Sequence, residues 1–403
     1  GWGPENFNIP FSKYFNPKFF QGPGSETLFD RAHNMFVEIL VTMGLLGLLS
    51  YLGIFAVSLR VLWKKIHDKE TILYGVGLIP LLIAYAIHNS FIFDTSANFL
   101  VFFTILGFIS WLASNKDTNI PMNANDTNNT NKKKQILRQT KAGVMYPIVA
   151  VALLISSGVV IYQINILPAV ANYTSTRAII YGWNKDFPGA MAKYEEAVSY
   201  DVPGKYEYRH RLAQYVLEQG TSGEIKPEQE DALKFAIEEV MKNIDENKVD
   251  YLPYLYVSRL YLTLGKGDPK SEYNDKALEY SLAALALAPD FVRTYYEIGQ
   301  AYLNKEDFDK AAEYFKKAAE LNPEVGLSYW YWGVVEIERG NTKFGLEILE
   351  KTLSSGLYTP SENEIGKLIN IYLEKQDYAK LAWAYGILVK SNPTKPQYRA
   401  SLA

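Results

Sequence analysis

Cysteine is absent from the 403-residue chain, and histidine is scarce. Without cysteine the chain can form no disulfide, no thiolate metal site and no cysteine nucleophile. The four histidines are His33, His67, His88 and His210. They form no HExxH motif and do not lie at metal-ligand spacing from one another. We therefore expect no bound metal and no other cofactor.

A basic balance is also missing, as are the short motifs of common enzymes. The net charge is -3 and the lysines are scattered, which leaves no positive field to attract nucleic acid. The sequence contains no Gly-x-Ser-x-Gly elbow, no Gly-x-x-x-x-Gly-Lys phosphate loop and no dinucleotide-binding fingerprint. Nucleic-acid binding and the common cytosolic enzyme classes are therefore disfavoured.

Long apolar runs fill the first part of the chain. Four of them indicate membrane spans, although the third is short: residues 35–63, 72–93, 98–113 and 144–167. The connections after the first and third runs are basic, which predicts that both are cytoplasmic. The first carries Arg60, Lys64, Lys65 and Lys69, and the other carries Lys132, Lys133, Lys134, Arg138 and Lys141. Alternation then places residues 1–34, the turn around Asp94 and everything after about residue 168 outside the cytoplasm.

The second half of the chain carries a helical repeat. Residues 291–324 follow the spacing of one tetratricopeptide unit. In it, Gly299 and Ala311 let two antiparallel helices approach closely, and Pro323 ends the second helix. Other units fit the same pattern through Tyr181, Ala190, Tyr194, Ala197, Pro289, Gly333, Leu349, Tyr372, Tyr385 and Pro393. We expect about six hairpins, two of them irregular because of insertions near residues 220–229 and 265–274.

These patterns predict an all-α protein with polytopic transmembrane helices followed by a tetratricopeptide α-solenoid. The expected order is an extracytoplasmic loop, three transmembrane helices, a polar cytoplasmic linker, a fourth transmembrane helix and the repeats, at residues 1–34, 35–113, 114–143, 144–167 and 171–393. Because the chain opens on Gly1 with no Met and no signal peptide, we interpret it as the C-terminal part of a longer polypeptide. The solenoid predicts a protein partner, although most of its aromatic residues are expected to be core.

Two polar clusters lie at the outer ends of the first two spans, where polar groups are costly. In residues 29–34, His33 can act as a general base or as a cation beside a diphosphate, and Arg31 can neutralise phosphate charge. The other interpretation is that Arg31, His33 and Asn34 anchor and cap a helix at the interface. The second cluster runs from His88 to Asp94, and Glu38 can pair with Arg31 or reach the interface.

The chain from residue 1 to about residue 113 resembles the O-antigen ligase superfamily. The resemblance rests on residues 1–7 (Gly-Trp-Gly-Pro-Glu-Asn-Phe), on residues 29–34 (Phe-Asp-Arg-Ala-His-Asn) and on the span that begins Met-Phe-Val-Glu and contains Gly-Leu-Leu-Gly-Leu-Leu. It implies an enzyme that moves a glycan from a polyprenyl diphosphate carrier to a lipid, glycan or protein acceptor outside the cytoplasm. It implies His33 and Arg31 as catalytic residues, and Asp30, Asn34, His88 and Asp94 as substrate-binding residues.

The same resemblance implies a multi-pass protein of the bacterial cytoplasmic membrane, and the flanking charges place its repeats on the extracytoplasmic side. Family members use upstream arginines to hold the diphosphate, so this chain alone is expected to be an incomplete catalyst. Ligase, polymerase and protein glycosyltransferase all remain open. The aromatic residues between Phe7 and Phe29 are expected to lie in the interface or to stack on sugars. The alternative function is a non-enzymatic, membrane-anchored repeat scaffold for an envelope complex.

Overall fold

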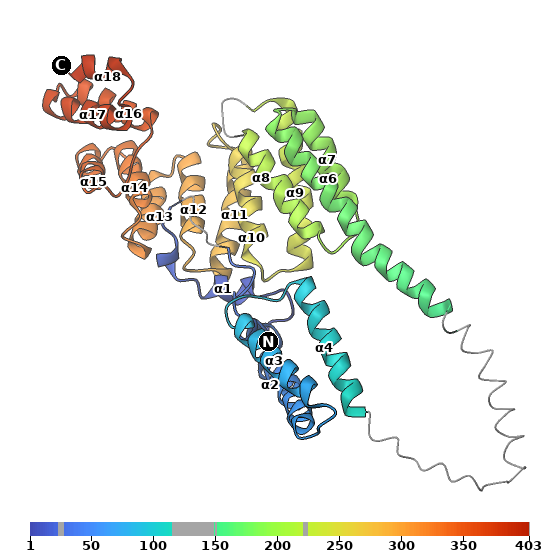
Figure 1. Ribbon diagram of the computed structural model, residues 1–403. Helices are drawn as coiled ribbons and strands as arrows, with labels where there is room; N and C mark the ends of the chain where they lie inside the picture. The colour runs from blue at the N-terminus through green and yellow to red at the C-terminus, as the bar shows by residue number, and fades with distance from the viewer. Residues whose placement is uncertain (23–27, 115–148, 150, 221–224, 403) are drawn as a thin grey trace, which may run out of the picture. The chain divides into compact units, whose positions relative to one another are not determined.

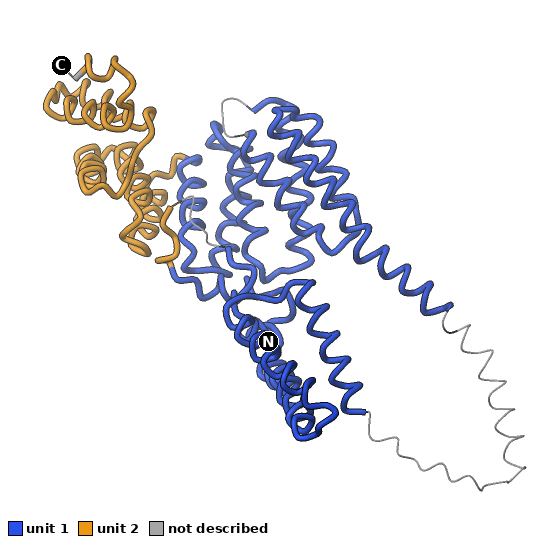
Figure 2. The backbone as a smooth tube through the Cα atoms, viewed as in Figure 1, with its two compact units in different colours: residues 1–16, 26–305 blue, residues 17–25, 306–403 orange. Residues whose placement is uncertain are grey.

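The computed structural model describes residues 1–22, 28–114, 149, 151–220 and 225–402, and within these ranges it contains helices and no strand (Figure 1). The all-α prediction is confirmed. The chain divides into two compact units (Figure 2): Gly1–Asn16 with Glu26–Lys305, and Pro17–Ser25 with Glu306–Ala403. Most of the predicted cytoplasmic linker (residues 115–143) and the start of the predicted fourth span (residues 144–148) lie outside the described residues.

Four helices in the first unit are long and apolar enough to cross a membrane. They are α2 (Met35–Ile66), α3 (Ile72–Asn89), α4 (Ser96–Ser114) and a helix from Val151 to Trp183. The third apolar run, predicted to be short, forms a 19-residue helix, close to the ~20 residues that a crossing needs. The second helix ends at Asn89 and not at the predicted Phe93, because the chain turns there.

Helix α2 is broken near its start, at Gly44. This residue has φ 75° and ψ -172°, a conformation that glycine adopts without a steric penalty. Close to the break, the backbone carbonyls of Val41 and Thr42 accept hydrogen bonds from the N–H groups of Trp2 (2.9 Å) and Gly3 (2.8 Å). Backbone groups in an apolar environment need such partners, and Trp2 and Gly3 supply them for two carbonyls beside the break.

Helices α2, α3 and α4 pack around a small apolar core, which is made of Phe55, Leu62, Leu82, Phe102, Ile109 and Leu112. Gly75 allows α3 to approach α2, because a Cβ there would lie 3.0 Å from the carbonyl oxygen of Leu62. Many other apolar side chains are exposed, including Leu46 (79% exposed) and Leu73 (81%). Exposed apolar surface on this scale fits contact with lipid better than contact with water.

The fourth apolar helix runs into the repeat region without a break. A π-helical turn, η2 (Tyr162–Ile166), leads directly into α6 (Leu167–Trp183). The sequence predicts a span that ends at Leu167 and a repeat that begins at residue 171. In the structure one continuous helix contains both. Its later part already belongs to the repeats, where it buries Ala171, Thr174, Ser175 and Ala178.

The rest of the first unit consists of antiparallel helix pairs. Helix α6 pairs with α7 (Phe187–Ser199), α8 (Lys205–Gly220) with α9 (Pro227–Glu246), and α10 (Tyr251–Leu264) with α11 (Glu272–Leu287), and α12 (Val292–Asn304) follows. The second unit holds α13 (Phe308–Leu321), α14 (Gly326–Glu338), α15 (Thr342–Ser354), α16 (Glu362–Glu374), α17 (Tyr378–Ser391) and α18 (Pro396–Leu402). This is the tetratricopeptide-like helical arrangement that the sequence predicts.

One turn recurs between the helices of a pair. An aspartate side chain caps the second helix by accepting a backbone N–H: Asp186 for α7, Asp307 for α13 and Asp377 for α17. The residue before each aspartate adopts a positive φ: Lys185 (59°), Glu306 (59°) and Gln376 (57°). Each cap of this kind stabilises its helix by about 1 kcal/mol. The turn therefore fixes the residue at which the second helix of these three pairs begins.

Small residues set the closest crossing within a hairpin. A Cβ on Gly345 would lie 2.5 Å from the carbonyl oxygen of Gly333, and a Cβ on Gly333 would lie 2.7 Å from Leu349. Helices α14 and α15 therefore cross with their backbones nearly in contact. This is the close approach that the sequence predicts from glycine and alanine at these repeat positions.

Candidate functional site

The two predicted polar clusters are joined by Asn34. Its side-chain oxygen caps α2 by accepting the backbone N–H groups of Phe36 (3.0 Å) and Val37 (3.1 Å). Its Nδ2 donates to the carbonyl oxygen of Ser90, at 2.9 Å, just beyond the end of α3. Asn34 thus acts as a helix cap, as the structural interpretation expects, and also holds the ends of α2 and α3 together.

His33 and Arg31 both pack on Phe93 of the second cluster. The ring centroids of His33 and Phe93 are 5.4 Å apart, and the guanidinium carbon of Arg31 lies 5.3 Å from the centroid of Phe93. The His33 side chain is exposed, and so is Asp30. Arg31 pairs with Glu5 at 3.1 Å and lies 3.8 Å from Asp30, so its charge already has two carboxylate neighbours.

Asp94 has a different environment, because it is buried inside the helix bundle. It is 5% exposed and accepts hydrogen bonds from the hydroxyl of Tyr85 (2.7 Å) and from Nδ2 of Asn89 (3.0 Å). Asn89 also donates to the hydroxyl of Tyr51, at 3.0 Å. This network ties α2, α3 and the loop after α3 together. His88 stays exposed, with Nδ1 3.3 Å from Oδ1 of Asn89, and the substrate-binding roles of His88 and Asp94 remain predictions.

Asn89 lies within the predicted second cluster but has no role assigned to it, and Tyr51 and Tyr85 are not among the predicted site residues. Polar groups inside an apolar stretch need partners within the bundle. Polar residues within the apolar runs are therefore the sequence signal that indicates this network. Among the described residues Arg31 pairs with Glu5 and Asp30 and not with Glu38, and the expectation that Glu38 reaches the interface stays a prediction. Glu38 accepts the backbone N–H of Ala32 at 2.8 Å and so fixes the loop that carries His33.

Part of the aromatic segment before the first span is buried against the repeats. It forms α1 (Asn8–Lys13), and Phe15, which is 2% exposed, packs with its ring centroid 5.0 Å from that of Phe291. Asn8 donates to Asp250, at 3.2 Å, just before α10. Figure 1 shows α1 beside α10. The interfacial expectation is therefore wrong for Phe15, whose ring lies among the repeats of the first unit.

In the second unit, the continuation of this segment is held by one asparagine. Asn322 is 2% exposed, and its Nδ2 donates to the backbone oxygens of Pro17 (2.9 Å) and Phe20 (2.7 Å). Phe20 is 1% exposed, whereas Phe19 is 51% exposed. The expectation of an interfacial or sugar-facing ring is therefore wrong for Phe20, although Phe19 remains accessible.

The carboxylate that binds Asn8 belongs to a buried polar group in the repeats. Asp250 is 3% exposed and accepts hydrogen bonds from Tyr206, Asn8 and the backbone N–H of Leu252. Burial raises the pKa of Asp250, and burial together with this neighbouring carboxylate raises the pKa of Tyr206. The segment before the first span thus supplies one of the donors that this buried carboxylate needs.

His210 lies nearby and is part of the core. Its ring packs 4.5 Å from Tyr206 and 5.0 Å from Tyr256, measured between ring centroids. Among the described residues its Nε2 has no hydrogen-bond partner, and burial lowers the pKa of His210 to about 3. A neutral imidazole packed between two tyrosines serves the packing of the repeats.

Comparisons with known proteins bear on the repeats. The tetratricopeptide repeat family model matches residues 292–325. Similar solved structures include MamA from Desulfovibrio magneticus RS-1 (17% identity, TM-score 0.36, covering 46% of this chain and 93% of that one). Another is the C-terminal part of a TPR repeat-containing protein from Cytophaga hutchinsonii (17% identity, TM-score 0.39, covering 58% of this chain and 88% of that one). A third is PilF of Pseudomonas aeruginosa (14% identity, TM-score 0.39, covering 58% of this chain and 97% of that one). No curated protein matches the chain, and none of these findings concerns the O-antigen ligase resemblance.

Proposed function

We propose that the chain is a membrane-anchored tetratricopeptide protein whose helical array binds a protein partner outside the cytoplasm. The observation that carries the proposal is the array itself, in which a repeat matched by the family model at residues 292–325 is one of a series of similar helices. Stacked helical hairpins present extended surfaces, and such surfaces bind proteins and peptides. The repeats therefore act by binding.

Charge and helix continuity support the anchoring. The end of α2 and the turn before α3 carry Arg60, Lys64, Lys65 and Lys69, which favours a cytoplasmic position for this turn. The fourth apolar helix continues directly into α6. If the helices span in alternate directions, the repeats begin on the opposite side, where they can meet an envelope protein.

Photo-cross-linking of the full-length protein in its own membrane tests the binding role. Trp183 is 79% exposed and lines a cavity of about 420 Å³ between α6 and α8. We expect benzoylphenylalanine at position 183 to give an adduct with one partner of defined mass. The matched control carries the same photoreactive residue at Leu73 of α3, which is 81% exposed and faces lipid in this account. Identical adducts at both positions would contradict the proposal.

A second candidate function is glycan transfer of the O-antigen ligase type. The observation that favours it is the exposed His33, held with Arg31 against Phe93 where α2 begins. In this proposal His33 accepts the proton of an acceptor hydroxyl, and Arg31 stabilises the leaving diphosphate of a polyprenyl-linked glycan. His33→Ala in the full-length protein should then abolish transfer, while His67→Ala at the other end of α2 should leave it intact. Unchanged glycan profiles in both strains would remove this candidate.

A further inference from the structure

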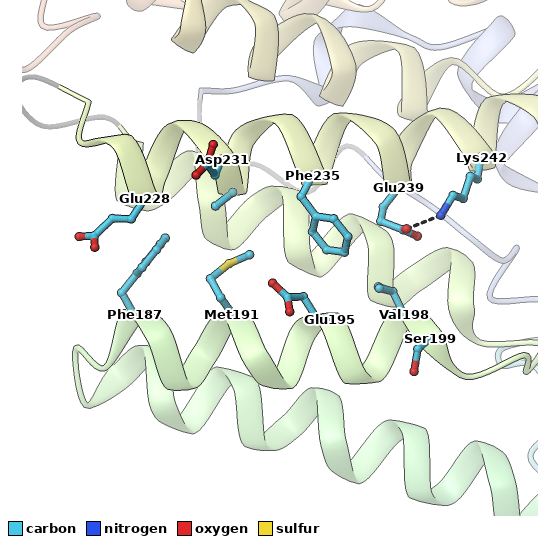
Figure 3. Close-up of a pocket in the computed structure, with 11 residues that line it drawn as sticks. Phe187, Met191, Glu195, Val198, Ser199, Glu228, Asp231, Phe235, Glu239 and Lys242 are labelled. Carbon is cyan, nitrogen blue, oxygen red and sulfur yellow. Dashed lines mark hydrogen bonds and ion pairs between the residues drawn. The ribbon is translucent and has the colours of Figure 1, made fainter.

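A groove runs between α7 and α9 in the first unit and encloses a cavity of about 800 Å³. Figure 3 shows the two helices side by side and running in the same direction. Phe187 and Glu228 lie at one end of the groove, and Ser199 and Lys242 lie at the other. The groove is thus open along the length of two neighbouring helices.

The floor of the groove is apolar. Helix α7 contributes Phe187, Met191 and Val198, and α9 contributes Ala232 and Phe235. Phe187, Met191 and Val198 share one face of α7, so they form a stripe about 17 Å long at 1.5 Å per residue. That length corresponds to about three turns of a helix. A groove between two parallel helices fits the ridge of a third helix better than it fits a compact small molecule.

The rim of the groove is acidic, and its charge is not neutralised. The side chains of Glu195, Glu228 and Asp231 are exposed, and none of the three forms an ion pair with another described residue. Two nearby lysines are already paired, Lys193 with Glu196 and Lys234 with Glu230. Lys226, two residues before Glu228, is exposed and forms no ion pair with these carboxylates among the described residues.

The opposite end of the groove differs in charge. Glu239, which is 6% exposed, pairs there with Arg209 and Lys242. The groove therefore offers two unpaired carboxylates at the end that holds Phe187, a third, Glu195, midway along α7, and none at the end that holds Lys242. An occupant must bring positive charge to the acidic part of the groove.

We propose that this groove binds an amphipathic helix of the protein partner, with lysines or arginines beside its apolar face. The proposal rests on the proposed binding function and names the chemistry of the partner. The apolar face of the partner helix packs on Met191 and Phe235, and its basic residues pair with Glu195, Glu228 and Asp231. Charge complementarity selects this occupant, because anionic lipids and nucleic acids are repelled by the same carboxylates.

The absence of cysteine allows a direct test. Ser199→Cys places the only thiol of the chain at the edge of the groove, where an environment-sensitive fluorophore can be attached. The full chain in zwitterionic lipid nanodiscs is titrated with a synthetic 14-residue helix of leucine and lysine, and then with a leucine and glutamate helix. We expect a saturable fluorescence change with the lysine peptide only, after subtraction of the signal from empty nanodiscs.

Charge-neutral variants locate the binding. Glu195→Gln, Glu228→Gln and Asp231→Asn together should weaken binding of the lysine peptide about ten-fold, since three exposed ion pairs are lost. The matched control removes the same number of exposed acidic charges elsewhere, through Glu279→Gln, Glu338→Gln and Glu374→Gln, and should bind like the parent protein. Equal responses to both peptides, or equal affinities of the two triple variants, would overturn the proposal.

The cross-link at position 183 separates this inference from the proposed function. If the groove variant loses affinity for the peptide and also loses the partner adduct, both proposals are supported. If the adduct persists at the parent yield while the groove variant binds peptide normally, the partner uses another surface and only the inference fails. If position 183 gives no adduct and neither peptide binds, both fail.

Discussion

His33 and His210 show how differently the two regions of this molecule use the same side chain. His33 is exposed at the start of the first apolar helix, whereas His210 is buried between Tyr206 and Tyr256 in the repeats. An exposed imidazole beside Arg31 can meet a substrate. A buried one stays neutral and fills space. Burial therefore separates the two histidines: His210 serves packing, whereas His33 is open to a ligand.

The largest expected effect is a loss of stability, compared between a buried arginine of the repeats and an exposed arginine beside the spans. Arg209 is buried and contacts Glu239 (3.4 Å), Glu246 (3.0 Å) and Asn243 (2.8 Å). Arg209→Met should destabilise α8 and α9 by on the order of 3 kcal/mol, because the buried Glu239 carboxylate loses one of its two cationic partners and the buried side-chain oxygen of Asn243 loses its donor. Arg31→Met should cost no more than about 1 kcal/mol, since Glu5 is mostly exposed. Hydrogen exchange of the α9 amides and of the α2 amides measures the two losses, and equal losses would break the comparison.

The next effect is a pH dependence from His210. Because its pKa is about 3 in the folded chain and near 6.5 when unfolded, the unfolded state binds the proton more tightly. The stability that His210 contributes is therefore full above about pH 6.5 and falls by up to about 1.4 kcal/mol per pH unit below it. His210→Phe should flatten the dependence of repeat stability on pH between 4 and 6. Asp250 has a raised pKa and acts in the opposite direction, so it cannot mimic the His210 effect.

A smaller effect concerns the junction of α2 and α3. Asn34→Ala removes a helix cap and the hydrogen bond to Ser90, so it should cost about 1–2 kcal/mol. Ser361→Ala removes the cap of α16 and the local hydrogen bond from the Ser361 hydroxyl to Glu364, but no contact to another helix, and should cost about 1 kcal/mol. Exchange of the first-turn amides of α2 and α16 measures both. If Asn34→Ala costs less than Ser361→Ala, the link between the two polar clusters is unimportant.

The sequence predicts the repeats well because their pattern is local. The glycine pair of α14 and α15 and the aspartate-capped turns follow from residues at most about a dozen positions apart, within one hairpin. The contact between Asn8 and Asp250 joins residues 242 positions apart, so no periodicity can reveal it. The same holds for the contact of Phe15 with Phe291, which buries a ring that the sequence places in the interface.

The polar clusters could be predicted only in part: their side of the membrane follows from the sequence, but the contacts of their side chains do not. Topology predicted that residues 29–34 and 88–94 share one side, and the hydrogen bond from Asn34 to Ser90 brings them together. The burial of Asp94 could not be read from the sequence, because it depends on Tyr85 and Asn89 facing the bundle interior. Helix orientation within the bundle decides such contacts, and the apolar runs are too uniformly hydrophobic to specify it.

One measurement tests most directly the claim that this protein acts through binding by its repeats. In a single strain, His33→Ala is introduced into the full-length protein that carries the photoreactive residue at position 183, and adduct yield and surface glycans are measured together. The account predicts that the partner adduct forms at the parent level whatever happens to the glycan profile. Absence of an adduct at position 183 in the parent protein would contradict it, whereas loss of the glycan profile with an unchanged adduct would add a catalytic role for His33.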